Sequence, residues 1–220
     1  MKSSDTYRES ISPSLSESGG DQGDAALDHV LDSSEQFAMA AGLILRASGD
    51  DSSREGLERT PERFRKAMGH LLSGYSKTAR EAVGEGIFAG EGSGLVSIRD
   101  VEFYSLCEHH MLPFWGKASV AYYPRKKILG LSKIPRLVNL FSRRFQVQER
   151  LTEQLADALV ELINPKAVVV RVQACHLCMM MRGVEKQNSN TVTETTRGLE
   201  KLSDLDSRRL LRAVGSDSAD

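Results

Sequence analysis

The sequence predicts an α+β fold, in which helices come first and strands separated by helices follow. Apolar residues recur at helical spacing in the first third of the chain, for example at Phe64, Met68 and Leu71. From Leu95 onward the spacing becomes that of strands, and two amphipathic segments interrupt the later strands. Helices followed by a mixed region are typical of α+β folds rather than of a regularly alternating parallel sheet.

The N-terminal part is expected to be a polar tail followed by a helix. Residues 1–24 are rich in Ser, Gly, Asp and Glu and have almost no large apolar residues, a composition that predicts disorder. Residues 25–47 then carry apolar side chains at helical spacing, and the helix should end near Gly49.

A second helix is expected from Thr60, which is an N-cap candidate. Pro61 suits the first helical position and Glu62 suits the positive end of the helix dipole. Gly74 is the expected end of this helix.

Strand candidates occupy the middle of the chain. Alternation from Val96 to Phe103 is broken near Arg99 and Asp100, and residues 118–123 and 127–131 flank a Pro-Arg turn. A further β-branched segment, residues 167–174, completes the set.

Helices are expected between and after these strands. Ile134, Leu137, Val138 and Phe141 follow the i, i+3, i+4, i+7 pattern. The next helix spans residues 151–163 and ends at Asn-Pro, and residues 207–214 are expected to form a short closing helix.

Composition excludes several classes of function. The 220 residues are 40% apolar and 27% charged, which is close to the average for globular proteins. The formal net charge is -1, so the chain lacks the excess of basic residues that is typical of nucleic-acid-binding proteins. No segment approaches the roughly 18–20 apolar residues of a membrane helix, and the N-terminus lacks the apolar core of a secretory signal. Three cysteines do not suggest a disulfide framework, so we expect free thiols in the cytoplasm.

Two short segments concentrate the metal-binding side chains. Cys107-Glu-His109-His110 and Cys175-His176-Leu-Cys178 together hold all three cysteines and three of the five histidines. Thiolate and imidazole are the ligands that zinc prefers. In a turn, Cys107 and His110 can face one ion, and in an extended segment His176 and Cys178 share a face while Cys175 lies on the other.

Two kinds of zinc site are consistent with these segments. If His176 binds the ion, four ligands close a structural site, and the protein is a non-catalytic binding or regulatory module. If His176 stands off, three ligands leave a position for water, which is the catalytic pattern. The additional His109 favours chemistry, because a structural site has no use for it.

A run of basic and polar residues forms a second candidate site. Ser132 is an N-cap candidate, and the following amides with Lys133 would bind an anion. Arg182 lies four residues after Cys178, so it reaches the same neighbourhood. The phosphate-loop pattern Gly-x-x-x-x-Gly-Lys is absent. The members of the run are Ser132, Lys133, Arg136, Arg143, Arg144, Gln146, Gln148, Glu149, Arg150 and Arg182.

Four motifs, in order, resemble the GTP cyclohydrolase I family. They are Ser105-Leu-Cys-Glu-His-His-Met-Leu-Pro113, Gly130-Leu-Ser-Lys-Ile-Pro-Arg136, Gln146-Val-Gln-Glu-Arg150, and His176-Leu-Cys178 followed by Met181-Arg-Gly183. The resemblance runs from about Leu57 to Gly198. It implies a tunnelling fold, with an antiparallel sheet and paired helices. One catalytic domain would span residues 25–214, with a helical part over 25–90 and the tunnelling fold over 91–214.

The resemblance also implies an activity and an assembly. Members convert GTP to 7,8-dihydroneopterin triphosphate and formate, the first step of folate or tetrahydrobiopterin synthesis. They assemble as homodecamers with active sites between subunits. Zinc would be held by Cys107, His110 and Cys178 and would supply the water that attacks C8 of guanine.

The remaining roles are carried over position by position. His109 and His176 match residues that move protons, and Ser132 matches one near the ribose. Glu149 matches the carboxylate that holds the guanine edge, with Gln148 beside it. The triphosphate would be bound by Lys133, Arg136, Arg182 and, as a further match, Arg63.

The sequence departs from the family pattern at two positions. Phe145 stands where many members carry proline, which changes the stiffness of the loop. Glu194 stands where a small hydroxyl residue is expected, which concerns packing or a subunit contact.

Overall fold

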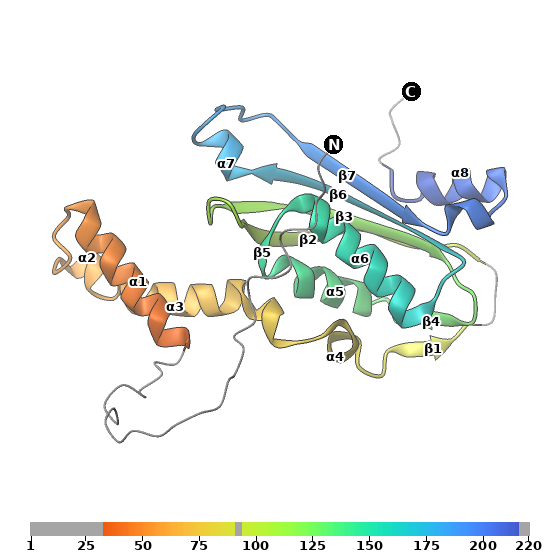
Figure 1. The fold of residues 1–220 in the computed structure, drawn as a ribbon, viewed down its shortest axis with the longest axis horizontal. Helices are drawn as coiled ribbons and strands as arrows, with labels where there is room; N and C mark the ends of the chain where they lie inside the picture. Colours follow the sequence, from red (N-terminus) through yellow and green to blue (C-terminus); the bar gives the residue numbers. More distant parts are fainter. Residues whose placement is uncertain (1–32, 91–93, 216–220) are drawn as a thin grey trace, which may run out of the picture.

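A five-stranded sheet forms the centre of the protein in the computed structural model, which describes residues 33–90 and 94–215 (Figure 1). The strand order is β5-β2-β3-β6-β7. All neighbours pair antiparallel except β5, which lies parallel to β2. The strands are β2 (Val96–Cys107), β3 (Pro113–Tyr123), β5 (Phe145–Gln146), β6 (Ala167–His176) and β7 (Thr191–Arg197). This architecture confirms the α+β prediction.

Two helices cover one face of the sheet and bury the main core. They are α5 (Lys133–Ser142) and α6 (Gln148–Ile163), whose apolar residues lie at helical spacing. Leu137, Leu155 and Leu159 on these helices are at most 1% exposed, and they belong to one cluster with Phe114 and Val170 of the sheet. Burial of this amphipathic stripe fixes both helices against the strands.

Among residues 33–90 and 94–215, the elements that cover the opposite face of the sheet lie at one end of it. There α8 (Asp204–Arg212) packs Leu210 against a second cluster that includes Ala121 and Val169. The rest of this face carries polar and aromatic side chains, among them Tyr104, which is 65% exposed.

The N-terminal helices extend away from the sheet (Figure 1). The helix α1 (Ser33–Ser48) packs on α3 (Thr60–Leu71), with the short α2 (Glu55–Glu58) between them. On α1, Met39, Leu43 and Ile44 are more than half exposed. The chain then passes through η1 (Ser73–Ser76) and α4 (Ala79–Val83) to β1 (Ile87–Ala89), which pairs with β4 (Lys127–Leu129).

Most expected elements are present with shifted ends. The expected tail lies outside the described residues, and α1 is described from Ser33 and ends at Ser48, beside Gly49. Thr60 is the first residue of α3 rather than its N-cap, because the preceding Arg59 takes that position, and the helix stops at Leu71, before Gly74. The expected break at Asp100 is confirmed as a bulge, where Asp100 adopts φ 56° and the pairing with β3 shifts register.

The strand β7 is not predicted by the sequence pattern. Its residues alternate threonine with Val192, Glu194 and Thr196, so apolar alternation is missing. Thr193 instead meets polar side chains of α6, since its hydroxyl lies 2.6 Å from that of Thr152. Within residues 33–90 and 94–215, none of the helices has the length and apolarity required to span a bilayer.

Candidate metal centre and substrate site

A tight turn between β2 and β3 shapes the first half of the metal site. The amide of Met111 donates to the carbonyl oxygen of Cys107 (2.8 Å), and the amide of Cys107 donates to that of Leu112 (2.9 Å). Met111 adopts φ 54°, which allows the sharp reversal. The turn brings His110 back beside Cys107, with 3.8 Å between His110 Nδ1 and Cys107 Sγ.

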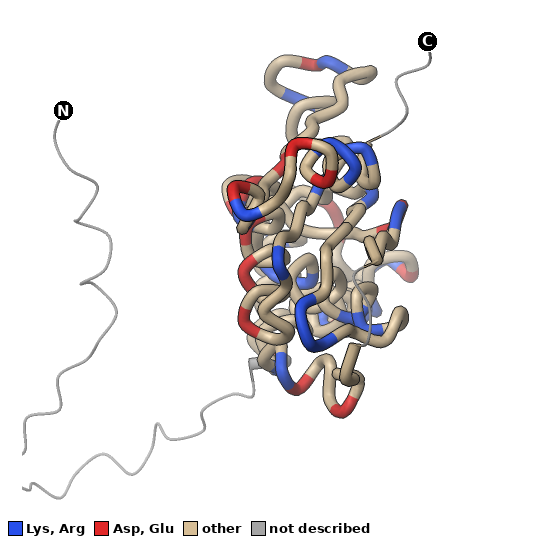
Figure 2. Tube along the Cα trace, turned by 90° about the vertical axis from the view of Figure 1, so that its right-hand side faces the viewer, with Lys and Arg blue, Asp and Glu red and all other residues tan. Residues whose placement is uncertain are grey.

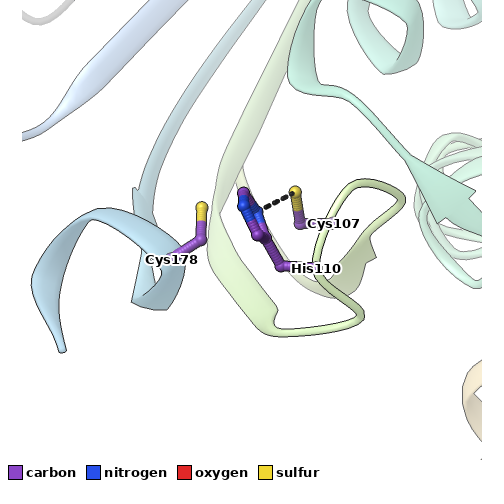
Figure 3. A group of neighbouring side chains, drawn as sticks. All are labelled: Cys107, His110 and Cys178. Atoms are coloured by element: carbon purple, nitrogen blue, oxygen red, sulfur yellow. Dashed lines mark hydrogen bonds between the residues drawn. The ribbon is translucent and has the colours of Figure 1, made fainter. Parts of the chain in front are cut away.

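Cys178 completes a group of three potential ligands (Figure 3). It lies on α7 (Leu177–Met180), the helical turn that follows β6. The potential ligand atoms of Cys107, His110 and Cys178 all lie within 4.8 Å of one another. Figure 3 shows the imidazole of His110 between the two sulfur atoms.

This group fits a zinc ion. Two thiols and one imidazole form a typical zinc donor set, and three protein ligands leave a fourth tetrahedral position. Cys107 is buried and Cys178 partly buried, whereas His110 is exposed, so the group opens on one side. Burial raises the pKa of the Cys178 thiol, with the neighbouring Cys107 adding to the shift. A bound cation opposes this effect, because it stabilises the thiolate.

The prediction that Cys178 lies in an extended segment with His176 is wrong, because β6 ends at His176 and α7 begins at Leu177. Cys178 is turned toward Cys107 by a helical turn rather than by strand alternation. Cys175, the last but one residue of β6, lines a pocket on the open face of the sheet with Trp115 and Lys117.

His176 lies outside the metal group and is held by two contacts. Its ring stacks on Phe114 with centroids 4.6 Å apart and planes 3° from parallel. Its Nε2 is 2.8 Å from Oε1 of Gln148. Burial lowers the pKa of His176, and the charge of nearby Glu149 partly offsets this.

His109 is exposed on the turn, next to His110. Its side chain is 64% exposed, and its Nδ1 lies 3.8 Å from Cys107 Sγ. The neighbouring Glu108 accepts two hydrogen bonds, of 2.6 and 2.8 Å, from Arg150 on α6. Sequence reasoning missed this ion pair, because nothing in the pattern relates the two positions, 42 residues apart.

The two residues expected at the guanine lie in different environments. Glu149 is exposed at the start of α6, and its carboxylate makes no hydrogen bond or ion pair within residues 33–90 and 94–215. Gln148 is 1% exposed, and its amide nitrogen donates to the carbonyl oxygens of Val172 and Thr191 and to the hydroxyl of Thr193. Glu149 is therefore free to meet a ligand, whereas the amide of Gln148 is already bonded.

Among the basic residues expected at the triphosphate, Arg182 lies at the metal group, with its Nη1 3.0 Å from His110 Nε2. Its neighbourhood with Cys178, expected from their spacing, is therefore present in the structure.

Lys133 and Arg136 lie elsewhere, on the first turn of α5. This helix starts after β4 and leads to β5, which pairs with Leu106 and Cys107. A helix of 10 residues is about 15 Å long, so the first turn of α5 and the metal group lie toward opposite ends of the sheet (Figure 1). Ser132 takes the N-cap position, but its hydroxyl makes no capping bond.

Arg63 is exposed on α3, outside the sheet. One chain therefore does not gather all the expected phosphate ligands around the metal group. Lysines and arginines are interspersed with acidic residues over the molecule rather than forming one basic face (Figure 2).

The chain is similar in sequence to one family of known proteins. Residues 37–214 match the family model described as GTP cyclohydrolase I. The chain is 59% identical over 155 residues to "GTP cyclohydrolase 1" of Deinococcus radiodurans, covering 70% of this chain and 72% of that protein. It is 55% identical over 158 residues to the protein of the same name from Leptospira biflexa, covering 72% and 86% of the two chains.

A third relative, "GTP cyclohydrolase 1" of Campylobacter jejuni, is 50% identical over 165 residues, covering 75% of this chain and 87% of that protein. The matched region contains the metal group, both neighbouring histidines and α5. The match thus covers most of the described chain, including every element that carries the site. The chain belongs to the GTP cyclohydrolase I family.

Proposed function

We propose that this protein is a zinc-dependent GTP cyclohydrolase I, which hydrolyses and rearranges GTP to 7,8-dihydroneopterin triphosphate and formate. Membership of the family supports the activity. The observation that carries the proposal is the group of Cys107, His110 and Cys178, which has two further histidines beside it. The enzyme would act in the cytoplasm, where its three free thiols stay reduced.

Cys107, His110 and Cys178 would hold the zinc ion. Zinc in a three-ligand site supplies a water nucleophile by lowering the pKa of water from 15.7 to about 7. The open side of the group, at the exposed His110, is where C8 of guanine would approach.

His109 and His176 would move protons at the imidazole ring of guanine as it opens. Histidine suits this task because its unperturbed pKa lies near neutrality. His109 is exposed beside the metal group, and His176 is held by Phe114 and Gln148. Ser132 would lie near the ribose.

Glu149 would recognise the guanine edge. Its carboxylate is exposed and makes no hydrogen bond to the described residues, so it can accept from N1–H and N2–H of guanine as a bidentate pair. Adenine lacks both donors, which gives the enzyme a basis for rejecting ATP.

The triphosphate would be bound by Lys133, Arg136, Arg182 and Arg63. Because the first turn of α5 and the metal group lie toward opposite ends of the sheet, Lys133 and Arg136 would serve the metal group of a neighbouring subunit. This arrangement supports a homo-oligomer, which we propose to be a decamer. Residues 25–214 would form the single catalytic domain, preceded by the tail 1–24.

The test is to incubate the zinc-loaded protein with GTP and to measure formate and, after oxidation, neopterin fluorescence. We expect both products from GTP and neither from ATP. A protein that binds zinc but releases no formate would instead be a structural-zinc module, and the proposed activity would be wrong.

A further inference from the structure

A chain of hydrogen-bonded polar groups, buried or partly buried, connects α6 and β7 to His176. Its central member is Gln148, which is 1% exposed. The Nε2 atom of Gln148 lies 3.0 Å from the carbonyl oxygens of both Val172 and Thr191, and 3.2 Å from Thr193 Oγ1. On the other side of the amide, Oε1 lies 2.8 Å from His176 Nε2.

The two carbonyl groups determine which way the amide of Gln148 is turned. A carbonyl oxygen only accepts hydrogen bonds, so it must face the amide nitrogen. The reversed amide would place Oε1 against the oxygens of Val172 and Thr191, so that acceptors would face one another with no hydrogen between them.

Two threonines lead to the same orientation independently. The hydroxyl of Thr152 donates to the main-chain oxygen of Gln148 (2.8 Å), so its single hydrogen is used there. In the 2.6 Å contact between Thr152 and Thr193, Thr193 must therefore donate. Thr193 Oγ1 is then an acceptor for Gln148 Nε2, as the carbonyl groups also require.

The orientation of Gln148 determines the tautomer of His176. Because Oε1 only accepts, the Nε2 atom of His176 must carry a hydrogen. Stacking on Phe114 holds the plane of the ring. In neutral His176 the lone pair is thus on Nδ1, which has no hydrogen-bond partner in the part of the chain that the structure describes.

We propose that Gln148 is a positioning residue, which holds His176 in the Nε2–H tautomer and leaves Nδ1 as the nitrogen that exchanges a proton with the substrate. The role in proton transfer rests on the proposed function, whereas the tautomer follows from the hydrogen bonds alone. Gln148 then serves the reaction through His176 rather than by a contact of its side chain with guanine.

The tautomer can be measured directly in the zinc-loaded wild-type protein. Histidine labelled with ¹³C and ¹⁵N is incorporated, and the His176 signals are assigned in solid-state NMR spectra by comparison with a His176→Asn variant. We expect a neutral ring with Nε2 protonated and Nδ1 bare. A ring protonated at Nδ1 alone would overturn the proposal, whether or not the protein turns over GTP.

A variant separates positioning from substrate binding. Gln148→Met preserves the side-chain length but removes the acceptor, so His176 should lose its single tautomer. We expect turnover to fall by about 10²-fold, the size of a general acid–base contribution, with KM for GTP changed by less than about 3-fold. An unchanged turnover number with a raised KM would indicate a guanine contact and would overturn the proposal.

Gln146→Met is the matched control. Gln146 is also a buried glutamine, 1% exposed, and its amide bonds Phe141 and Gln154 without touching His176. It should lose comparable stability and retain the Nε2–H tautomer. If the control shifts the tautomer as much as Gln148→Met, the effect comes from general loosening and the proposal is wrong. If Gln148→Met does not fold, the wild-type NMR measurement still decides.

The experiments distinguish a failure of the proposed function from a failure of the proposed tautomer. A protein with the expected tautomer that releases no formate from GTP would refute the cyclohydrolase activity and leave the assigned tautomer intact.

Discussion

At the scale of single residues, chemistry depends on which way neighbouring side chains point. Cys175 and Cys178 are three positions apart and occupy different surroundings. Cys175 is the last but one residue of β6 and lines a pocket on the face of the sheet away from α5 and α6, whereas Cys178 is turned by α7 toward Cys107 and His110. Only the second thiol can share an ion with the turn after β2.

This difference predicts which thiol holds zinc. Cys178→Ser should lose most of the bound zinc, because a hydroxyl replaces a thiolate ligand. Cys175→Ser, as the matched control, should retain it, and so should His109→Ala. Elemental analysis of the purified variants gives the zinc content per chain. Zinc lost from Cys175→Ser but kept in Cys178→Ser would show that the ligand has been assigned to the wrong thiol.

Replacement of Glu149 should change the nucleotide selectivity of the enzyme and leave its metal content unchanged. Glu149→Ala should weaken GTP binding and reduce the preference for GTP over ATP, because the donors at N1 and N2 of guanine lose their acceptor. Competition of each nucleotide for the enzyme measures the ratio of the two affinities. An unchanged ratio would mean that another group reads the guanine edge.

At the scale of elements, the site depends on close contact between strands and helices. Gly116 of β3 pairs with Ala174 of β6, and a methyl group at Gly116 would collide with the carbonyl group of Gln173. This close approach holds the strand that delivers His176 and leads into α7. The ion pair between Glu108 and Arg150 likewise connects the turn between β2 and β3 to α6.

Gly116→Ala should therefore destabilise the protein by more than about 2 kcal/mol, since the β3–β6 backbones must separate. Gly69→Ala is the contrasting variant, because Gly69 lies in α3 and, apart from its neighbours and the backbone of its own helix, no atom of the described residues lies within 4 Å of an added methyl group. It should be more stable by up to about 1 kcal/mol through helix propensity. Denaturant unfolding compares the two, and equal stabilities would contradict the close packing at Gly116.

At the scale of the whole molecule, the residues proposed for the site lie in two separate places. The metal group lies at one end of the sheet, and the first turn of α5 lies toward the other. The exposed apolar residues of α1, and the part of the sheet that the described residues leave uncovered, are surfaces that further subunits can bury. Both features agree with sites formed between subunits.

Complementation tests this division. His176→Ala and Lys133→Ala should each be nearly inactive as pure homo-oligomers. When the two variants are co-expressed, some sites combine a wild-type His176 with a wild-type Lys133 from a neighbour, so activity should return. Formate release from purified mixed oligomers measures it. Activity that stays absent, or an active monomer in sedimentation, would contradict a shared site.

The sequence by itself determined the local structure and the kinds of ligand. The spacing of Ile134, Leu137, Val138 and Phe141 predicted α5, and the break at Asp100 predicted the bulge. Two segments rich in cysteine and histidine indicated a metal group, because thiols and imidazoles are uncommon enough to be informative when clustered. These features depend on residues close together in the chain.

Only the tertiary structure decided what depends on contacts between distant segments. It revealed β7, whose threonines pack on polar groups of α6 and so lack an apolar pattern. It turned Cys178 inward through α7, buried Gln148 against His176, and separated Lys133 from the metal group. A side chain's direction and partners are fixed by packing across the sheet, which spacing along the sequence does not encode.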